Sequence, residues 1–319
     1  MPQRPSPRAH ATKPTVAIVG AGSLATFLSM ALHRAGFKIT EIVSRDLPRS
    51  LRKARQLTAK VGAQTVTACS ASLDATVLWF CVPDREIHNA AKVMADRLPG
   101  RTAANQKNRV RYALHSSGAL LSRELNPLRQ AGAAIASVHP LMTFVPGVHP
   151  SLDDVPFAIE GDEPAVSVAR NIVRALGGES FSLPAKRKAA YHAWATLTSP
   201  LLLAFLVTLE QAALAAGLTR EDARRKSLPI IRQTLSNYSR LGPSNSFSGP
   251  LLRGDVKTVA KHLSALKKHP GVSEVYVALA RAALRGLPAR NKKELVRLLR
   301  SKPVGQAQTL PRHRTSSQN

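Results

Sequence analysis

The feature that most constrains the fold of this chain is a glycine turn between an apolar stretch and a helical pattern. Residues 15–19 form an apolar run of strand length, which is typical of a buried parallel strand. The turn Gly20-Ala-Gly22 follows, and apolar residues then recur at helical spacing until Gly36, where a helix is expected to end. A second strand is predicted at residues 38–43. This strand–turn–helix–strand order predicts a βαβ unit.

The alternation of strands and helices continues through the first half of the chain. Further strands are expected at residues 65–68, 75–82, 111–115, 134–138, 156–159 and 179–183. From residue 185 the pattern is helical, with helices expected at 185–217, 220–240, 255–268, 271–285 and 291–300. We therefore predict an α/β fold class, in which a doubly wound, mostly parallel Rossmann sheet is followed by an all-α C-terminal domain.

The 319 residues are enough for two ordinary domains. The predicted order is a disordered basic tail, a Rossmann domain that binds the cofactor, a helical domain for substrate binding and dimerisation, and a second disordered basic tail. These segments are assigned to residues 1–13, 14–183, 184–300 and 301–319.

The glycine turn spells G-x-G-x-x-A at the start of the first helix. In this position the pattern predicts a dinucleotide-binding turn. The first glycine permits the tight turn, the second lets the backbone approach a pyrophosphate, and the small third residue lets helix and sheet pack closely. Amides at the helix start then face the phosphates. The predicted cofactor-binding residues of this turn are Gly20, Ala21, Gly22, Ser23, Leu24 and Ala25.

The end of the second strand sets which dinucleotide fits. NAD-binding domains usually carry an acidic residue there for the ribose 2′-hydroxyl, and the corresponding position here is expected at Ser44, followed by Arg45. A hydroxyl and a guanidinium can hold a 2′-phosphate that a carboxylate would repel. The sequence therefore favours NADP over NAD. If the strand ends one or two residues later, Asp46 would instead lie on the ribose.

Val82 and Pro83 end the fourth strand, and ligands of such sheets bind outside the carboxyl ends of the strands. We expect both residues to line the nicotinamide side of the crevice.

Polar residues after two later strands are the candidates for substrate binding, namely Ser116, Ser117 and His139. No third ligand accompanies His139 and His149 at a useful spacing, so no metal site is expected.

Lys188 and His192 share one face of the first helix of the second domain because they are four residues apart. Either could supply the proton that accompanies hydride transfer, and Arg253 could hold an anionic group of the substrate. A solvated first turn for Lys188 and a hydrogen-bonded core position for His192 are the structural alternatives.

The formal net charge of +27 is unusual and draws anions to the surface. Aromatic residues make up only 4% of the chain and no zinc-finger or basic-zipper pattern is found, so sequence-specific nucleic-acid binding is not expected. Cys69 and Cys81 both lie in apolar, strand-like runs. A buried, reduced pair is predicted, which is consistent with a cytoplasmic location.

Residues 189–209 contain no Lys, Arg, Asp or Glu and are long enough to span a bilayer. The stretch also contains Tyr191, His192, Ser199 and Pro200. We interpret it as a buried central helix, with a subunit interface as one possible setting, and expect no membrane partner.

A set of motifs in a fixed order gives the chain a family resemblance. They are Gly20-Ala-Gly-Ser-Leu24, Cys81-Val-Pro-Asp84, His115-Ser-Ser-Gly-Ala119, His139-Pro-Leu-Met-Thr-Phe144, Tyr191-His-Ala193 and Gly249-Pro-Leu-Leu-Arg-Gly-Asp255. Over roughly residues 14–300 the chain resembles bacterial proteins that join a Rossmann-like domain to a domain of unknown function. These are similar to 6-phosphogluconate dehydrogenases, ketopantoate reductases, pyrroline-5-carboxylate reductases and deazaflavin-dependent NADP oxidoreductases.

The resemblance implies an NADP-binding domain, an active site in the cleft before a helical domain, and a homodimer formed through the helices. One departure is that Ser199-Pro200 stands where the family usually has Ser-Asn. In related dehydrogenases a helix asparagine anchors substrate near the lysine, so this change bears on the role of Lys188.

Three hypotheses for function follow. The first is an NADP-dependent oxidoreductase that transfers a hydride between nicotinamide and a small carbonyl, imine or hydroxy compound. The second is a non-catalytic NADP-binding sensor or scaffold. The third is a nucleic-acid-associated protein whose binding depends on its charge. A deazaflavin remains an alternative hydride partner.

Overall fold

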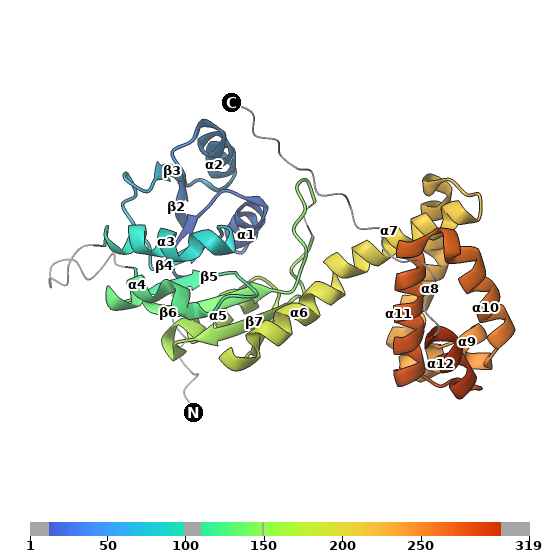
Figure 1. The fold of residues 1–319 in the computed structure, drawn as a ribbon. Helices are drawn as coiled ribbons and strands as arrows, with labels where there is room; N and C mark the ends of the chain where they lie inside the picture. Colours follow the sequence, from blue (N-terminus) through green and yellow to red (C-terminus); the bar gives the residue numbers. More distant parts are fainter. Residues whose placement is uncertain (1–12, 99–109, 149, 301–319) are drawn as a thin grey trace, which may run out of the picture. The chain divides into compact units, whose positions relative to one another are not determined.

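The computed structural model describes residues 13–98, 110–148 and 150–300. The chain divides into two compact units, Met1–Thr198 and Ser199–Asn319 (Figure 1). Almost all residues of the two predicted tails lie outside the described residues.

The first unit is built on one sheet of eight strands. The strands are β1 (Val16–Val19), β2 (Ile39–Ser44), β3 (Gln64–Thr67), β4 (Val77–Phe80), β5 (Tyr112–His115), β6 (Ala134–Pro140), β7 (Pro156–Gly161) and β8 (Glu179–Ser182). Their order is β3-β2-β1-β4-β5-β6-β7-β8. All neighbours pair in parallel except β6 and β7, which are antiparallel. The prediction of a mostly parallel Rossmann sheet is confirmed.

Helices cover both faces of the sheet because the strands are apolar on both sides. Val16 and Ile18 of β1 pack with α1 (Ser23–Arg34), α2 (Pro48–Val61) and α5 (Glu163–Ala175). Ala17 and Val19 point the other way and pack with α3 (Asp84–Ala95), η2 (Ser122–Leu125) and α4 (Asn126–Gln130). This alternation of side chains is the period of a strand buried on both faces.

The chain changes direction in the sheet between β1 and β4. Strands β2 and β3 extend the sheet to one side of β1, whereas β4 to β8 extend it to the other. The crossovers therefore diverge here and leave a crevice at the carboxyl ends of β1 and β4, which is where open α/β sheets bind ligands.

The second unit is helical throughout its described part. It contains α7 (Pro200–Ala215), α8 (Arg220–Ser246), α9 (Pro250–Arg253), α10 (Val256–Ala265), η4 (Leu266–Lys268), α11 (Pro270–Gly286) and α12 (Lys292–Arg300). Helix α8 bends at Gly242, whose φ of 73° is not helical, just beyond residue 240, where this helix was expected to end. A small core forms from Val259, Ala280, Leu284, Leu295 and Leu299. The predicted all-α region is confirmed.

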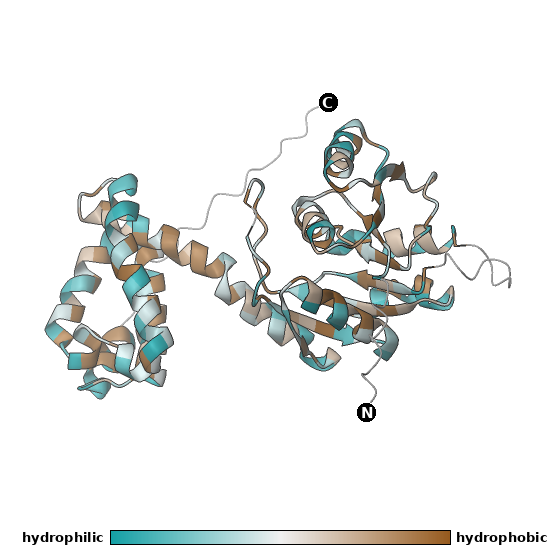
Figure 2. Cartoon of the chain, turned by 180° about the vertical axis from the view of Figure 1, so that it is seen from behind, coloured by the Kyte–Doolittle hydropathy of each residue, from teal (hydrophilic) through white to brown (hydrophobic). Residues whose placement is uncertain are grey.

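The apolar stretch at 189–209 is not the buried central helix that we predicted. It is divided between α6 (Lys188–Thr198) and α7, and α7 contains no buried residue. Figure 2 shows α7 coloured as largely hydrophobic. Among the described residues, only the helical stretch Ala185–Ala215 meets the length and composition needed to cross a membrane, with a mean hydropathy of 1.6 and none of its most apolar window buried. Within the described residues, α8 and α11 contact α7 but leave Leu201, Leu203 and Val207 exposed, so the stretch is not buried within this chain.

The prediction for the cysteines was wrong at one position. Cys81 is buried, but Cys69 is exposed and both thiols are free. Cys69 lies in a turn after β3 rather than within a strand, so it has no sheet neighbours to cover it.

Candidate cofactor and substrate site

Gly20 makes the closest backbone approach in the crevice. It follows β1 with a φ of 117°, and a Cβ there would lie 2.4 Å from the carbonyl oxygen of Cys81. Both the left-handed backbone and the contact with the chain after β4 exclude a side chain. The first glycine of the motif therefore lets the two strand ends meet.

Gly22 has a different role because a Cβ at this position would touch nothing within 4 Å. It is the N-cap of α1, whose first turn has no side-chain cap and no acidic residue. Amide groups at an uncapped helix start are free to bind an anion. The open space over Gly22 fits the pyrophosphate of a dinucleotide.

A cleft of about 530 Å³ opens at the carboxyl ends of β1, β2 and β4. It is lined by seven of the predicted cofactor residues, namely Gly20, Ala21, Gly22, Ser44, Arg45, Val82 and Pro83. Ser44 is the last residue of β2 and Arg45 follows it directly, whereas Asp46 does not line the cleft. The strand therefore ends at Ser44 rather than one or two residues later.

Three residues of α2 also line this cleft and were not identified from the sequence: Arg49, Ser50 and Lys53. Arg49 and Lys53 add to the positive charge of Arg45, and they share one face of α2 because they are four residues apart. A signal was present. The first turn of α2 has no acidic residue, although a helix N-terminus favours negative side chains. Cations gathered there indicate a site for an anion.

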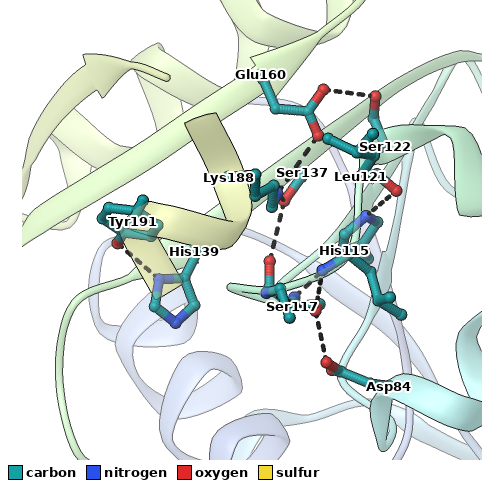
Figure 3. A network of polar contacts seen from close by, with 12 residues as sticks. Asp84, His115, Ser117, Leu121, Ser122, Ser137, His139, Glu160, Lys188 and Tyr191 are labelled. Carbon is teal, nitrogen blue, oxygen red and sulfur yellow. Dashed lines mark hydrogen bonds and ion pairs between the residues drawn. The ribbon is translucent and has the colours of Figure 1, made fainter. Parts of the chain in front are cut away.

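The cofactor crevice is joined to the polar turn after β5 by one hydrogen bond. Pro83 lines the cleft, and the next residue, Asp84, accepts a 2.8 Å bond at Oδ2 from the Ser117 hydroxyl (Figure 3). The same hydroxyl accepts bonds from the amides of Ala119 and Leu120, at 3.2 and 2.9 Å. The turn is therefore held rigidly beside the crevice, and the Ser117 hydroxyl already has three partners.

Ser116 points into the sheet. It is only 8% exposed, and its hydroxyl accepts a 2.9 Å hydrogen bond from Nε1 of Trp79.

His115, the last residue of β5, is hydrogen-bonded to this turn. Its Nδ1 accepts a 3.1 Å bond from the Ser117 amide, so Nε2 carries the proton that it donates to the Leu121 carbonyl at 3.0 Å. Burial, with a further contribution from the charge of Lys188, lowers the pKa of His115 to about 4. This neutral histidine holds the turn.

Lys188 is buried, with only 2% of its surface exposed. Its ammonium group donates to the Ser137 hydroxyl and lies 3.3 Å from Oε1 of Glu160 (Figure 3). Ser137 in turn donates to the Ser117 carbonyl at 3.2 Å. Burial lowers the pKa of Lys188, and Glu160 opposes that shift. The ion pair is thus linked through Ser137 to the turn after β5, which we call the Ser117 turn.

Glu160 is fully engaged as well. Its Oε1 accepts from the Ser122 amide at 2.6 Å, and its Oε2 accepts from the Ser122 hydroxyl at 2.9 Å.

Two histidines face the turn from the other side. A Cβ on Gly118 would lie 2.7 Å from Nε2 of His139 and 2.7 Å from Cδ2 of His192, and the two rings are 6.2 Å apart. The Tyr191 hydroxyl lies 2.8 Å from Nδ1 of His139. Burial lowers the pKa of His139 to about 4, with His192 and Lys188 contributing. Both imidazoles are partly exposed.

The structure thus brings together Ser116, Ser117, His139, Lys188 and His192 in the first unit. Arg253 lies in the second unit, where it is exposed at the end of α9. The neighbouring Asp255 caps α10 by accepting from the Thr258 amide at 3.1 Å. Within the described residues, no group of three or more His, Cys, Asp or Glu side chains could hold a metal ion.

Family models match both parts of the chain. A Rossmann-like domain matches residues 2–140, and a domain of unknown function (DUF2520) matches residues 155–283. The chain is a Rossmann-like–DUF2520 protein. No curated protein matches its sequence.

Solved structures share the fold of this Rossmann-like–DUF2520 protein along most of its length. A candidate NADP oxidoreductase from Bacteroides fragilis is 21% identical, with a TM-score of 0.68 over 85% of this chain and 97% of its own. A pyrroline-5-carboxylate reductase from Coxiella burnetii is 17% identical, with a TM-score of 0.54 over 89% and 99%. A reductive aminase from Aspergillus terreus, in complex with NADPH and ethyl-5-oxohexanoate, is 15% identical, with a TM-score of 0.58 over 91% and 100%.

Proposed function

We propose that this chain is an NADP-dependent oxidoreductase that transfers a hydride between nicotinamide and a small carbonyl, imine or hydroxy compound. The observation that carries the proposal is the cleft in which the Gly20–Gly22 turn meets Ser44, Arg45, Arg49 and Lys53. The turn provides amides for a pyrophosphate, and the cations provide a site for one further phosphate. NADP has that extra phosphate and NAD does not.

The substrate side of the proposal rests on the turn after β5. A bound NADPH would supply the hydride, and the protein would supply the proton. His192 is the better supported donor, because it is partly exposed beside Gly118, whereas the Lys188 ammonium is buried on Ser137 and Glu160. Lys188 would then act as a positioning residue through Ser137, which holds the Ser117 carbonyl.

His139 is proposed to orient the substrate. Burial keeps it neutral at pH 7, and Tyr191 engages its Nδ1. Nε2 then remains to bond a carbonyl or imine near Gly118. Ser116 and Ser117 shape this turn, and Arg253, the candidate for an anionic group, is exposed in the second unit. The complex of the Aspergillus terreus enzyme with a keto ester and NADPH supports the substrate class.

The test is a calorimetric titration of the purified protein with NADPH and, separately, with NADH. We expect tighter binding of NADPH, and a loss of about tenfold or more in Arg45→Ala and Arg49→Ala, because each removes a charged hydrogen bond. Arg52→Ala is the matched control, since Arg52 is exposed on the same helix but does not line the cleft. Binding of neither nucleotide would overturn the proposal.

A non-catalytic NADP-binding sensor or scaffold is the second candidate, favoured by the saturated hydrogen bonding of Ser117 and Lys188. NADPH oxidation with a panel of small ketones, cyclic imines and 2-hydroxy acids separates the two. Turnover that is lost in His192→Ala supports the enzyme. Tight NADPH binding with no turnover across the panel supports the sensor.

We also propose a cytoplasmic homodimer formed through the helical unit. Leu203, Val207 and Leu214, which share one face of α7 by helical spacing, are 62%, 42% and 42% exposed. An exposed apolar face of this kind marks an interaction surface. Light scattering in detergent-free buffer should give twice the monomer mass of 34.3 kDa. A monomer, or a protein that requires detergent, would contradict the dimer.

A further inference from the structure

Positive charge is concentrated at the end of the second unit. Residues 256–300, which we call the C-terminal basic module, comprise α10, η4, α11 and α12. The module holds eleven Lys and Arg side chains and two carboxylates, Glu274 and Glu294, an excess of nine positive charges. Such an excess destabilises a compact unit by self-repulsion unless an anion offsets it.

These cations are available for binding. All eleven are exposed, and none forms an ion pair with any residue in the part of the chain that the structure describes. Elsewhere in the second unit, by contrast, Glu210 pairs with Arg224, and Asp222 pairs with Arg225 and Lys226. The module therefore presents an excess of positive charge to solvent, and no ion pair among the described residues offsets it.

Much of this charge lies beyond the region that the family model matches. The DUF2520 match ends at residue 283. Residues 284–319 contain nine Lys and Arg and a single acidic residue, Glu294. The common function of the two matched domains thus does not account for the basic end of this chain.

The small number of exposed apolar side chains on the module indicates which class of polyanion it can bind. The apolar side chains of α12 are turned inward, where Leu295 and Leu299 are buried in the module's own core. Leu279 is the only large hydrophobic residue of the module, within the described residues, that is strongly exposed. A helix that inserts into a bilayer needs an exposed apolar face, so a membrane surface fits this module poorly.

The module also lacks the means to read bases. Its single Phe, Tyr or Trp side chain is Tyr276, which is half-buried. The Tyr276 hydroxyl lies 3.0 Å from Nδ1 of His262. Base stacking therefore has no platform here. Exposed Lys and Arg on several helices instead match the repeated charge of a phosphate backbone.

We propose that the C-terminal basic module binds the phosphate backbone of double-stranded nucleic acid without regard to base sequence. This interaction is separate from the cofactor binding that we propose for the first unit.

The experiment measures the anisotropy of fluorescent duplexes of about 20 base pairs, in two unrelated sequences, at salt concentrations of about 50 to 200 mM. The full-length protein is compared with the triple variant Lys292→Gln, Lys293→Gln, Arg297→Gln. The matched control triple is Lys38→Gln, Lys92→Gln, Arg111→Gln, which removes equal charge from exposed positions of the first unit. NADPH is included in a parallel series to occupy the cationic cleft.

We expect the full-length protein to bind both duplexes equally, with or without NADPH. In the module variant, the slope of log affinity against log salt should fall by about 2 to 3, and binding should weaken at least about tenfold at 100 mM salt. The control should change by less than about twofold. If circular dichroism shows that the module variant does not fold, it is replaced by a double variant on α10, Lys257→Gln with Lys261→Gln.

Four results would overturn the proposal: no duplex binding by the full-length protein, equal losses in module variant and control, displacement by NADPH, or dependence on base sequence. Vesicles with and without phosphatidylserine provide a further arm. Binding to anionic vesicles but not to duplexes would assign the module to a membrane surface instead.

Discussion

Nζ of Lys188 lies 3.3 Å from Oε1 of Glu160 in a buried ion pair that supports the Ser117 turn from behind. Removing the carboxylate leaves an ammonium group buried without its counter-charge. We expect Glu160→Gln to lower the free energy of unfolding by about 3 to 5 kcal/mol, measured by urea denaturation. Glu163→Gln, which alters an exposed carboxylate three residues away, should change it by less than about 0.5 kcal/mol. Equal effects would mean that the ion pair is not formed.

His115 makes stability depend on pH. Its pKa is about 4 in the folded chain and about 6.5 in an unfolded one. Between these values the unfolded chain binds a proton that the folded chain does not, so stability should fall as pH falls from about 6.5 to 4, by roughly 3 kcal/mol. Urea denaturation at several pH values measures the slope. The slope should decrease in His115→Asn and stay unchanged in His33→Asn, which alters an exposed histidine.

Substitution of the two motif glycines should affect different properties, stability at Gly20 and NADPH binding at Gly22. Gly20→Ala places a Cβ 2.4 Å from the Cys81 carbonyl at a φ of 117° and is expected to unfold or strongly destabilise the chain. Gly22→Ala meets no protein atom within 4 Å, so it should cost no more than about 1 kcal/mol while weakening NADPH binding at least tenfold. Thermal melting and calorimetry together distinguish these outcomes. A Gly22→Ala protein that binds NADPH normally would contradict the placement of the pyrophosphate.

Gly118 keeps a space open between two imidazoles. Gly118→Ala puts a methyl group 2.7 Å from both His139 and His192, so at least one ring must move. We expect altered histidine ring signals in the NMR spectrum, with NADPH affinity within about twofold of wild type, because the cleft itself is unchanged. Gly271→Ala, at a glycine with no neighbour within 4 Å and no left-handed backbone, is the control for the loss of a glycine. Unaltered ring signals in Gly118→Ala would contradict the described packing.

Local sequence patterns were sufficient to predict the strands and helices of the fold. The eight strands and the helical second half could be predicted because strand periodicity, turn glycines and helix spacing act over a few residues. The same holds for the Gly20–Gly22 turn and for Ser44 and Arg45 at the end of β2, since a motif within one βαβ unit carries its own geometry.

Contacts between distant segments were decided only by the tertiary structure. No local sequence pattern identifies Glu160 or Asp84 as a site residue. Yet Glu160 pairs with Lys188, and Asp84 accepts a hydrogen bond from Ser117, each some thirty positions away. Arg49 and Lys53 enter the cleft only because α2 packs beside β2. The sequence by itself determined the type of sheet, the glycine turn and the charge. Which cations are buried in an ion pair, which line the cleft and which stay exposed depended on how the chain folds back on itself, because electrostatic partners are chosen by distance in space.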